Sequence, residues 1–191
     1  AGEPFTFTLT ESASTTISGG PPVTVGRTEA APATVVVTDG DAPVPGSLDT
    51  VEGSVFPDAT TFVNNSSTAS VKLNEAQKIV DVEINGVTTN TADTTVDITD
   101  SLLTGSADAV SIALDSSTDM GNITVNDGTG GVEIYNIDVA GQNTVSDLVV
   151  DSSGETVNIT GAGDLTISTT IDNATTINGS TATGDLTLET A

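Results

Sequence analysis

The sequence from Ile79 to Ala191 contains no lysine, arginine, histidine, proline, cysteine, phenylalanine or tryptophan. Without cations, this segment has no charged side chain to hold a phosphate or to stabilise an oxyanion. What remains is mostly valine, isoleucine, leucine and alanine set among threonine, serine, asparagine, aspartate and glycine. Short β-branched segments between turn-forming residues are typical of β-strands. The segment therefore predicts a structural element and no enzyme.

Positive charge is almost absent from the whole chain, which has 3 basic against 27 acidic residues and a formal net charge of −24. The three cations are Arg27, Lys72 and Lys78, so none lies beyond Lys78. Such a field repels nucleic acid and anionic lipid and attracts divalent cations. The chain also lacks cysteine, which excludes disulfides, a thiol nucleophile and cysteine metal sites.

Long apolar runs are missing too: none approaches the roughly 20 residues of a membrane span, and no signal-peptide pattern is present. The scarcity of lysine, with 18 aspartates to 9 glutamates, favours a secreted surface protein or one from salty surroundings. The chain begins at Ala1 without methionine and stops within a strand-like pattern. We therefore expect a processed chain or a fragment.

The distribution of proline divides the chain, because all seven prolines lie between Pro4 and Pro57. We predict a small β-rich or extended N-terminal region over residues 1–46 and a repeat domain over residues 47–191. In the first region, Phe5–Leu9 alternates as a half-buried strand does, and Thr34–Thr38 predicts a second strand. Phe5–Leu9 is either an ordinary first strand or an arm that a neighbouring copy accepts into its sheet.

Beyond Val80, apolar residues recur in pairs at a spacing near that of one short strand and its turn, and turn residues such as Asn85-Gly86 follow most pairs. The two members of each pair are separated by one residue, so they face the same side of a strand. The pairs are Val82/Ile84, Val96/Ile98, Val110/Ile112, Ile123/Val125, Val132/Ile134, Ile137/Val139, Leu148/Val150, Val157/Ile159, Leu165/Ile167 and Leu186/Leu188. We expect Tyr135, which falls between two such pairs, to lie half-buried at a bulge or strand switch.

An internal repeat underlies these pairs. The segment Gly163–Ile167 matches Gly184–Leu188 one repeat later, and it matches Gly121–Val125 two repeats earlier. A repeat of about 20 residues is typical of one solenoid coil. It predicts an all-β, right-handed parallel β-solenoid, with roughly five coils spanning about 25 Å in the segment that begins at Ile79. The alternative is an antiparallel β-sandwich, whose strands recur at a similar spacing.

Calcium is the cofactor that the turns suggest, because hard cations take oxygen ligands from carboxylates and turn carbonyls. The segment Gly161–Leu165 approaches the calcium-binding nonapeptide of β-rolls, with a contracted spacing. The alternative is that the acidic turns are solvated and attract cations only as a diffuse atmosphere. The candidate ligands are Asp39, Asp41, Asp115, Asp119, Asp127 and Asp164.

Asparagine glycosylation is a further candidate modification. Six asparagines begin an Asn-x-Ser/Thr sequence, about twice the number that the serine and threonine content would produce by chance. They are Asn64, Asn65, Asn122, Asn158, Asn173 and Asn178.

The segments Gly131–Ile137 and Thr156–Ile167 resemble the repeats of bacterial surface-layer (S-layer) proteins and of related repeats-in-toxin adhesins, and the similarity covers roughly residues 95–191. Those repeats carry a Gly-Val-Glu phrase followed by coils rich in threonine, asparagine and glycine. The resemblance implies a secreted, often calcium-dependent β-solenoid that assembles into a lattice on the cell envelope. Intact calcium nonapeptides are absent here.

The sequence therefore predicts a non-enzymatic extracellular structural protein that associates with itself into a surface lattice or fibre, with cell-envelope polysaccharide as a further candidate partner. Two other functions stay open. An adhesin stalk or carbohydrate-binding module would be monomeric, although an aromatic content of 3% argues against sugar stacking. A secreted lyase-type β-helix would need carboxylate pairs that work without histidine.

Overall fold

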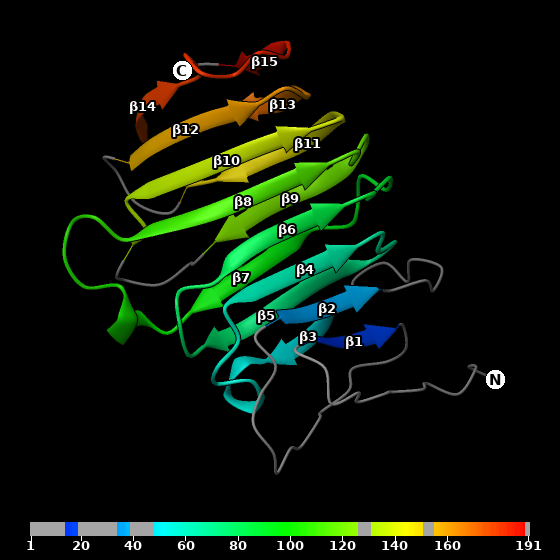
Figure 1. Cartoon of the computed structure of the whole chain (residues 1–191), viewed down its shortest axis with the longest axis vertical. Helices are drawn as coiled ribbons and strands as arrows, with labels where there is room; N and C mark the ends of the chain where they lie inside the picture. Colours follow the sequence, from blue (N-terminus) through cyan, green and yellow to red (C-terminus); the bar gives the residue numbers. More distant parts are fainter. Residues whose placement is uncertain (1–13, 19–33, 39–47, 126–130, 151–154, 190–191) are drawn as a thin grey trace.

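The computed structural model of the chain describes residues 14–18, 34–38, 48–125, 131–150 and 155–189, which form two parallel β-sheets (Figure 1). We call the eight-stranded sheet sheet A and the seven-stranded sheet sheet B. Sheet A contains β1 (Ser14–Ser18), β2 (Thr34–Thr38), β4 (Thr61–Asn65), β6 (Asp81–Asn85), β8 (Ala109–Asp115), β10 (Ile134–Ala140), β12 (Glu155–Gly161) and β14 (Ala174–Asn178), in that order. Sheet B contains β3 (Leu48–Glu52), β5 (Ser70–Ala76), β7 (Thr94–Ile98), β9 (Met120–Val125), β11 (Gln142–Val149), β13 (Asp164–Thr170) and β15 (Leu186–Glu189). Two 3-10 turns, η1 (Gly53–Val55) and η2 (Asp100–Leu102), lie between strands.

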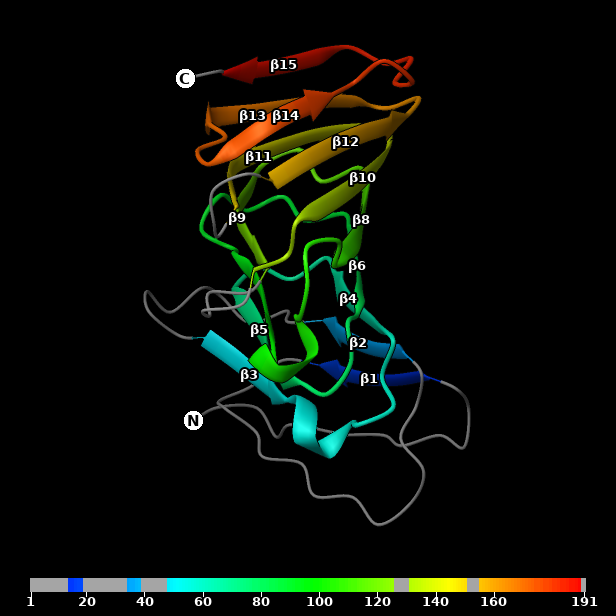
Figure 2. The same cartoon turned by 90° about the vertical axis from the view of Figure 1, so that its left-hand side faces the viewer.

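From β2 onward the chain alternates between the sheets, and we call one sheet A strand with the following sheet B strand a coil. Figure 1 shows the strands of the two sheets pointing in opposite directions, and Figure 2 shows the sheets as two facing walls. Every pairing between neighbouring described strands is parallel. The chain is thus an all-β parallel solenoid, as predicted, and it has about six turns. The antiparallel sandwich is wrong, because hairpins would pair consecutive strands and here each strand pairs across a whole coil.

Side chains that point inward stack in columns, one residue from each coil. Val82, Ile112, Ile137 and Ile159 occupy one such column in register, and each is at most 2% exposed. Burying an aliphatic side chain of this size contributes about 1.5–3 kcal/mol. The predicted apolar pairs in β6, β7, β8, β9, β12 and β13 are buried in this way, which confirms those inward-facing positions.

The pattern fails immediately before β10, where the predicted pair Val132/Ile134 does not lie on one face of a strand. Within β10, the predicted pair Ile137/Val139 is buried, and each residue is 2% exposed. Ile134 is only half-buried, and the inward alternation begins one residue later, at Tyr135. Tyr135 is fully buried, in continuous register with Val110 and Val157, so the predicted bulge and half-exposed ring are wrong. Its hydroxyl donates to the Val125 carbonyl at 3.3 Å, which allows the polar end of the ring to enter the core.

Coil length varies more than the sequence repeat suggests. The step from β4 to β6 joins Thr61 to Asp81, whereas the longer step from β6 to β8 joins Val82 to Ile112. The match between Gly163–Ile167 and Gly184–Leu188 is confirmed, since these segments stack in register.

The more distant match, to Gly121–Val125, does not correspond to structural register. Ile123 stacks on Leu148, whereas Leu165, its counterpart in the sequence match, stacks on Asn143. This part of the predicted repeat is therefore wrong, because the coil between the two segments is longer than the repeat. Five sheet A strands follow Ile79, which agrees with the predicted number of coils.

At the corner where sheet A passes into sheet B, one residue has a left-handed backbone in each of the four coils that begin with β4, β6, β8 and β10. Glycine tolerates this conformation, whereas serine is strained in it. The N–H groups of three of these residues donate to carbonyls of the next coil, at Asn85, Asp115 and Ala140. The corner residues are Ser66 (φ 55), Gly86 (φ 65), Ser116 (φ 54) and Gly141 (φ 65).

The N-terminal region is only partly described. The predicted strand Thr34–Thr38 is confirmed as β2, and β1 and β2 both belong to sheet A. Phe5–Leu9 lies outside the described residues. The division between residues 1–46 and 47–191 therefore stays a prediction.

Candidate functional site

The predicted calcium ligands are spread along the solenoid. Asp115 is the last residue of β8, Asp119 lies in the turn before β9, and Asp164 is the first residue of β13. Asp115 and Asp164 both lie at the corner from sheet A to sheet B, but β10 separates their coils. The other three candidates, Asp39, Asp41 and Asp127, lie outside the described residues.

Two of the described candidates accept hydrogen bonds from nearby donors. Asp115 Oδ1 accepts the Ser116 hydroxyl at 2.8 Å, and Asp164 Oδ1 accepts the backbone N–H of Asp185 at 2.9 Å. In the part of the chain that the structure describes, no three His, Cys, Asp or Glu side chains come together in a group that could hold a metal ion. Calcium binding stays a prediction.

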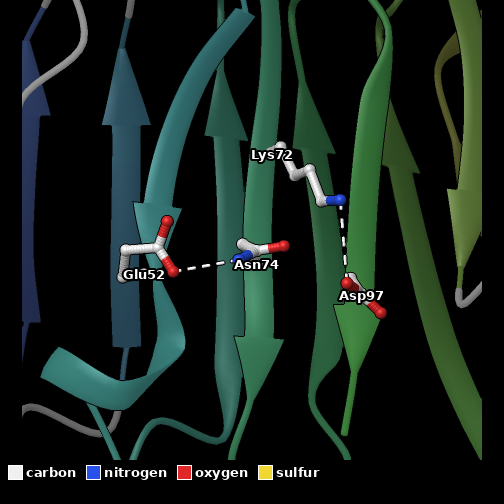
Figure 3. Close-up of polar contacts among 4 residues, drawn as sticks. All are labelled: Glu52, Lys72, Asn74 and Asp97. Carbon is white, nitrogen blue, oxygen red and sulfur yellow. Dashed lines mark hydrogen bonds and ion pairs between the residues drawn. The ribbon is translucent and has the colours of Figure 1, made fainter.

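On the outer face of sheet B, neutral and cationic side chains separate the carboxylates of successive coils (Figure 3). Asn74 Nδ2 donates to Glu52 Oε2 at 2.9 Å, one coil away. Lys72 Nζ lies 3.6 Å from Asp97 Oδ2, and both side chains are about one-fifth exposed. Glu52 and Asp97 therefore each face a donor on an adjacent coil.

Hydroxyl and amide side chains take the same role in the later coils, where cations are absent from the sequence. Thr160 Oγ1 donates to Asp138 Oδ1 at 3.0 Å, and Thr169 Oγ1 donates to Asp147 Oδ1 at 2.6 Å. Three asparagines form a ladder on sheet A, with amide-to-amide distances of 3.0 and 3.5 Å. They are Asn136, Asn158 and Asn178.

None of the registered strand pairs in the described sheets places one carboxylate directly opposite another. Among the described residues, carboxylates of neighbouring coils stack at the corners. Asp164 and Asp185 do so at one corner, next to the registered pair Leu165 and Leu186.

At the corner where sheet B passes into sheet A, three acidic residues form a column: Asp108, Glu133 and Glu155. Asp108 and Glu133 directly precede β8 and β10, and Glu155 is the first residue of β12. The Asp108 N–H donates to Glu133 Oε2 at 2.8 Å, and Glu155 is 1% exposed. The sequence did not point to this column, because the three acids are unequally spaced. The sequence signal that could have identified these acids is their position immediately before a stretch in which apolar residues alternate with polar ones.

A second set of polar residues lies inside the solenoid. Asn64 Nδ2 donates to Thr94 Oγ1 at 2.8 Å across the core between β4 and β7, and both residues are at most 1% exposed. The Ser117 N–H donates to Asn143 Oδ1 at 3.0 Å, and Asn143 Nδ2 donates to the Ala140 carbonyl at 2.8 Å. The Asn64–Thr94 and Ser117–Asn143 bonds join successive coils, and the Asn143–Ala140 bond lies within one coil. Together they satisfy buried polar groups.

The predicted glycosylation sequences differ in exposure. Asn64 is fully buried, so the folded chain does not present it. Asn122 and Asn158 are half-buried. The exposed members are Asn65, Asn173 and Asn178.

No family model, curated protein or solved structure matches the chain. Among the described residues, no helix has the length and hydropathy required to cross a membrane. The candidate site is therefore described by its own residues: a stack of coils in which several polar side chains bond to the next coil.

Proposed function

We propose that this chain is a non-enzymatic extracellular structural protein that self-assembles into a surface layer of the S-layer type or into a fibre. One observation carries the proposal: the described coils stack without interruption, and several of their outer side chains bond to the next coil. Stacked coils that contact only their neighbours make an extended element whose length grows with the number of coils. Such an element suits a scaffold.

The chemistry of the surface supports the same function. Thr160, Thr169 and the asparagine ladder are engaged in contacts between coils. The acidic charge keeps such rods soluble and repels nucleic acid. The resemblance of residues 95–191 to S-layer and repeats-in-toxin coils supports an extracellular location.

Calcium enters this proposal as a stabilising counter-ion. Successive coils are about 4.8 Å apart, well within a Debye length of about 8 Å at physiological salt, so their carboxylates repel one another. Divalent cations lower this repulsion whether they bind at specific residues or gather around the surface.

The test is electron microscopy and light scattering of the purified chain, first with calcium and then with chelator. We expect ordered sheets or fibres in calcium and smaller particles after chelation. Monodisperse monomers in both conditions would refute self-assembly.

An adhesin stalk is the second candidate, because a stack of parallel coils serves equally as a spacer. A stalk remains monomeric at every concentration and needs no contact between copies. A third arrangement, a filament built by insertion of Phe5–Leu9 into a neighbour, predicts that deleting residues 1–9 abolishes assembly.

A further inference from the structure

The chain offers hydrogen peroxide one sulfur atom. Cysteine and methionine carry the sulfur groups that mild oxidants attack, and the sequence contains no cysteine and a single methionine, Met120. Met120 is the first residue of β9 and belongs to the apolar core. Its side chain is 0% exposed, so the fold encloses the only sulfur of the chain.

Backbone groups next to Met120 are bonded to the preceding coil. The Gly121 N–H donates to the Ala92 carbonyl at 3.2 Å, and the Asn122 N–H donates to Asp93 Oδ1 at 2.7 Å. A Cβ atom on Gly121 would overlap Asp93 Oδ1 and would lie 3.0 Å from the Ala92 carbonyl carbon. The β8–β9 coil is therefore packed closely against the β6–β7 coil at this point.

The following coil covers Met120 from the other side. Met120 is in register with Val145 of β11, which is 1% exposed. The Ser146 hydroxyl, also from β11, donates to the Met120 carbonyl at 2.9 Å. Because both neighbouring coils are bonded around Met120, an oxidant reaches the sulfur only when the β8–β9 coil separates locally from one of them.

Oxidation changes the polarity of this buried position. Hydrogen peroxide transfers one oxygen atom to the thioether sulfur, which loses two electrons and becomes a sulfoxide, while the peroxide is reduced to water. A sulfoxide is polar, and burial of a polar group in an apolar core is unfavourable. The open coil therefore closes less readily on the oxidised side chain than on the thioether.

We infer that Met120 is a redox-sensitive switch: the solenoid resists peroxide while its coils are closed, and oxidation of Met120 during a local opening prevents the β8–β9 coil from closing again. β9 is the central strand of sheet B among the described strands, so an open coil there interrupts the stack in its middle. The switch is a property of a single chain. It does not depend on the proposed self-assembly.

The first experiment measures the rate at which peroxide adds one oxygen atom, by mass spectrometry of intact protein and of peptides. Ser111→Met supplies the reference, because it places a second methionine on the exposed outer face of β8. We expect Met120 to be oxidised at least about 50-fold more slowly than the introduced methionine, since opening must precede the reaction. Equal rates at the two positions would overturn the inference.

Two alanine substitutions test whether the contacts of this coil control the opening. Asp93→Ala removes the carboxylate that accepts the Asn122 N–H, whereas Asp97→Ala removes a carboxylate from the outer face of β7, where it pairs with Lys72. We expect Asp93→Ala to raise the oxidation rate of Met120 at least about fivefold and Asp97→Ala to change it by less than about twofold. Circular dichroism checks that both variants are folded. An equal effect of the two substitutions would refute the control of opening by these contacts.

The consequence of oxidation is tested on wild type and Met120→Leu, since leucine has a similar volume and no sulfur. Both proteins are treated with peroxide at a urea concentration that unfolds them and are then returned to buffer without peroxide. We expect amide hydrogen exchange in β8–β11 of the treated wild type to be at least about tenfold faster than in its untreated sample. Treated Met120→Leu should match its own untreated sample. Full protection in the oxidised wild type would overturn the switch, and so would an equal loss of protection in Met120→Leu.

Discussion

Gly163 lies between β12 and β13, at a corner where sheet A passes into sheet B. The close approach of coils at this corner makes Gly163→Ala the most informative single substitution. An added Cβ atom would lie 2.6 Å from the Ala140 carbonyl carbon and 2.8 Å from the Gly141 nitrogen, and backbone atoms cannot move aside as a flexible side chain can. The stack must open locally, which also weakens two bonds between coils. These are Gly163 N–H to Val139 O at 2.9 Å and Asp164 N–H to Gly141 O at 2.8 Å.

Overpacking costs about 1–3 kcal/mol. Each of the two weakened bonds adds about 1 kcal/mol, which brings the total to about 3–5 kcal/mol. Because each coil of a solenoid is held mainly by its neighbours, the loss should be local. We expect amide hydrogen exchange to accelerate by at least tenfold in β12–β15 while β5–β8 keep wild-type protection.

The matched control is Gly179→Ala. The nearest atom to its added Cβ is the Leu186 Cδ1 at 2.7 Å, the end of a flexible side chain in the half-exposed last coil. We expect this variant to lose less than about 1 kcal/mol, since the neighbouring side chain can rotate away. If the backbone amides of β12 and β13 exchanged at the same rate in both alanine variants, the argument from coil spacing would be refuted.

Three further substitutions probe other contacts. Tyr135→Phe removes the hydroxyl that donates to Val125 and should cost about 1 kcal/mol in urea unfolding; a cost above about 3 kcal/mol would mean that the hydroxyl does more than satisfy one carbonyl. Ser116→Gly relieves a left-handed residue (φ 54) and should raise Tm by about 2–4 °C, while an unchanged or lower Tm would contradict strain at that corner. Lys72→Met should cost about 0.5–1 kcal/mol at low salt and less at roughly 1 M salt, whereas Lys78→Met, whose ion pair is more exposed, should cost less at any salt; equal losses would contradict the role of burial.

The sequence predicted the parts of the fold that depend on local alternation. Val157/Ile159 and Leu165/Ile167 were predicted as inward pairs because residues separated by one position lie on the same face of a strand. The stacking of Gly184–Leu188 on Gly163–Ile167 followed from a direct repeat of residues. In both cases the information lies within a short segment or in a close match between two segments.

The features that the sequence did not predict depend on contacts between residues that are distant in sequence. Asn64 resembles any turn-forming asparagine, but it is buried against Thr94, which belongs to the next coil. Tyr135 is accepted into the core because the carbonyl of Val125 lies within reach of its hydroxyl. Coils of unequal length hide both relationships from a search for a fixed period.

The looseness of the repeat has an electrostatic reason. In a stack with an exact repeat, every outward carboxylate would lie about 4.8 Å from its own copy in the next coil, where two charges at an effective dielectric constant of about 20 repel by roughly 3 kcal/mol. In a chain with 27 acidic residues, an exact repeat would add such a repulsion at many positions. The registered strand pairs avoid it: Asp138 faces Ala113 and Thr160, and Asp147 faces Asn122.

Placing one carboxylate directly above another in neighbouring coils should therefore destabilise the solenoid. Thr160→Asp would place a carboxylate beside Asp138 and remove the hydroxyl that donates to it at 3.0 Å. We expect a loss of about 1–2 kcal/mol at low salt, reduced at roughly 1 M salt because the added ions screen the repulsion. Thr160→Asn, which has a similar size and retains a donor, should lose less than half as much. If the two variants were equally stable at low salt, repulsion between coils would not explain why this repeat is inexact.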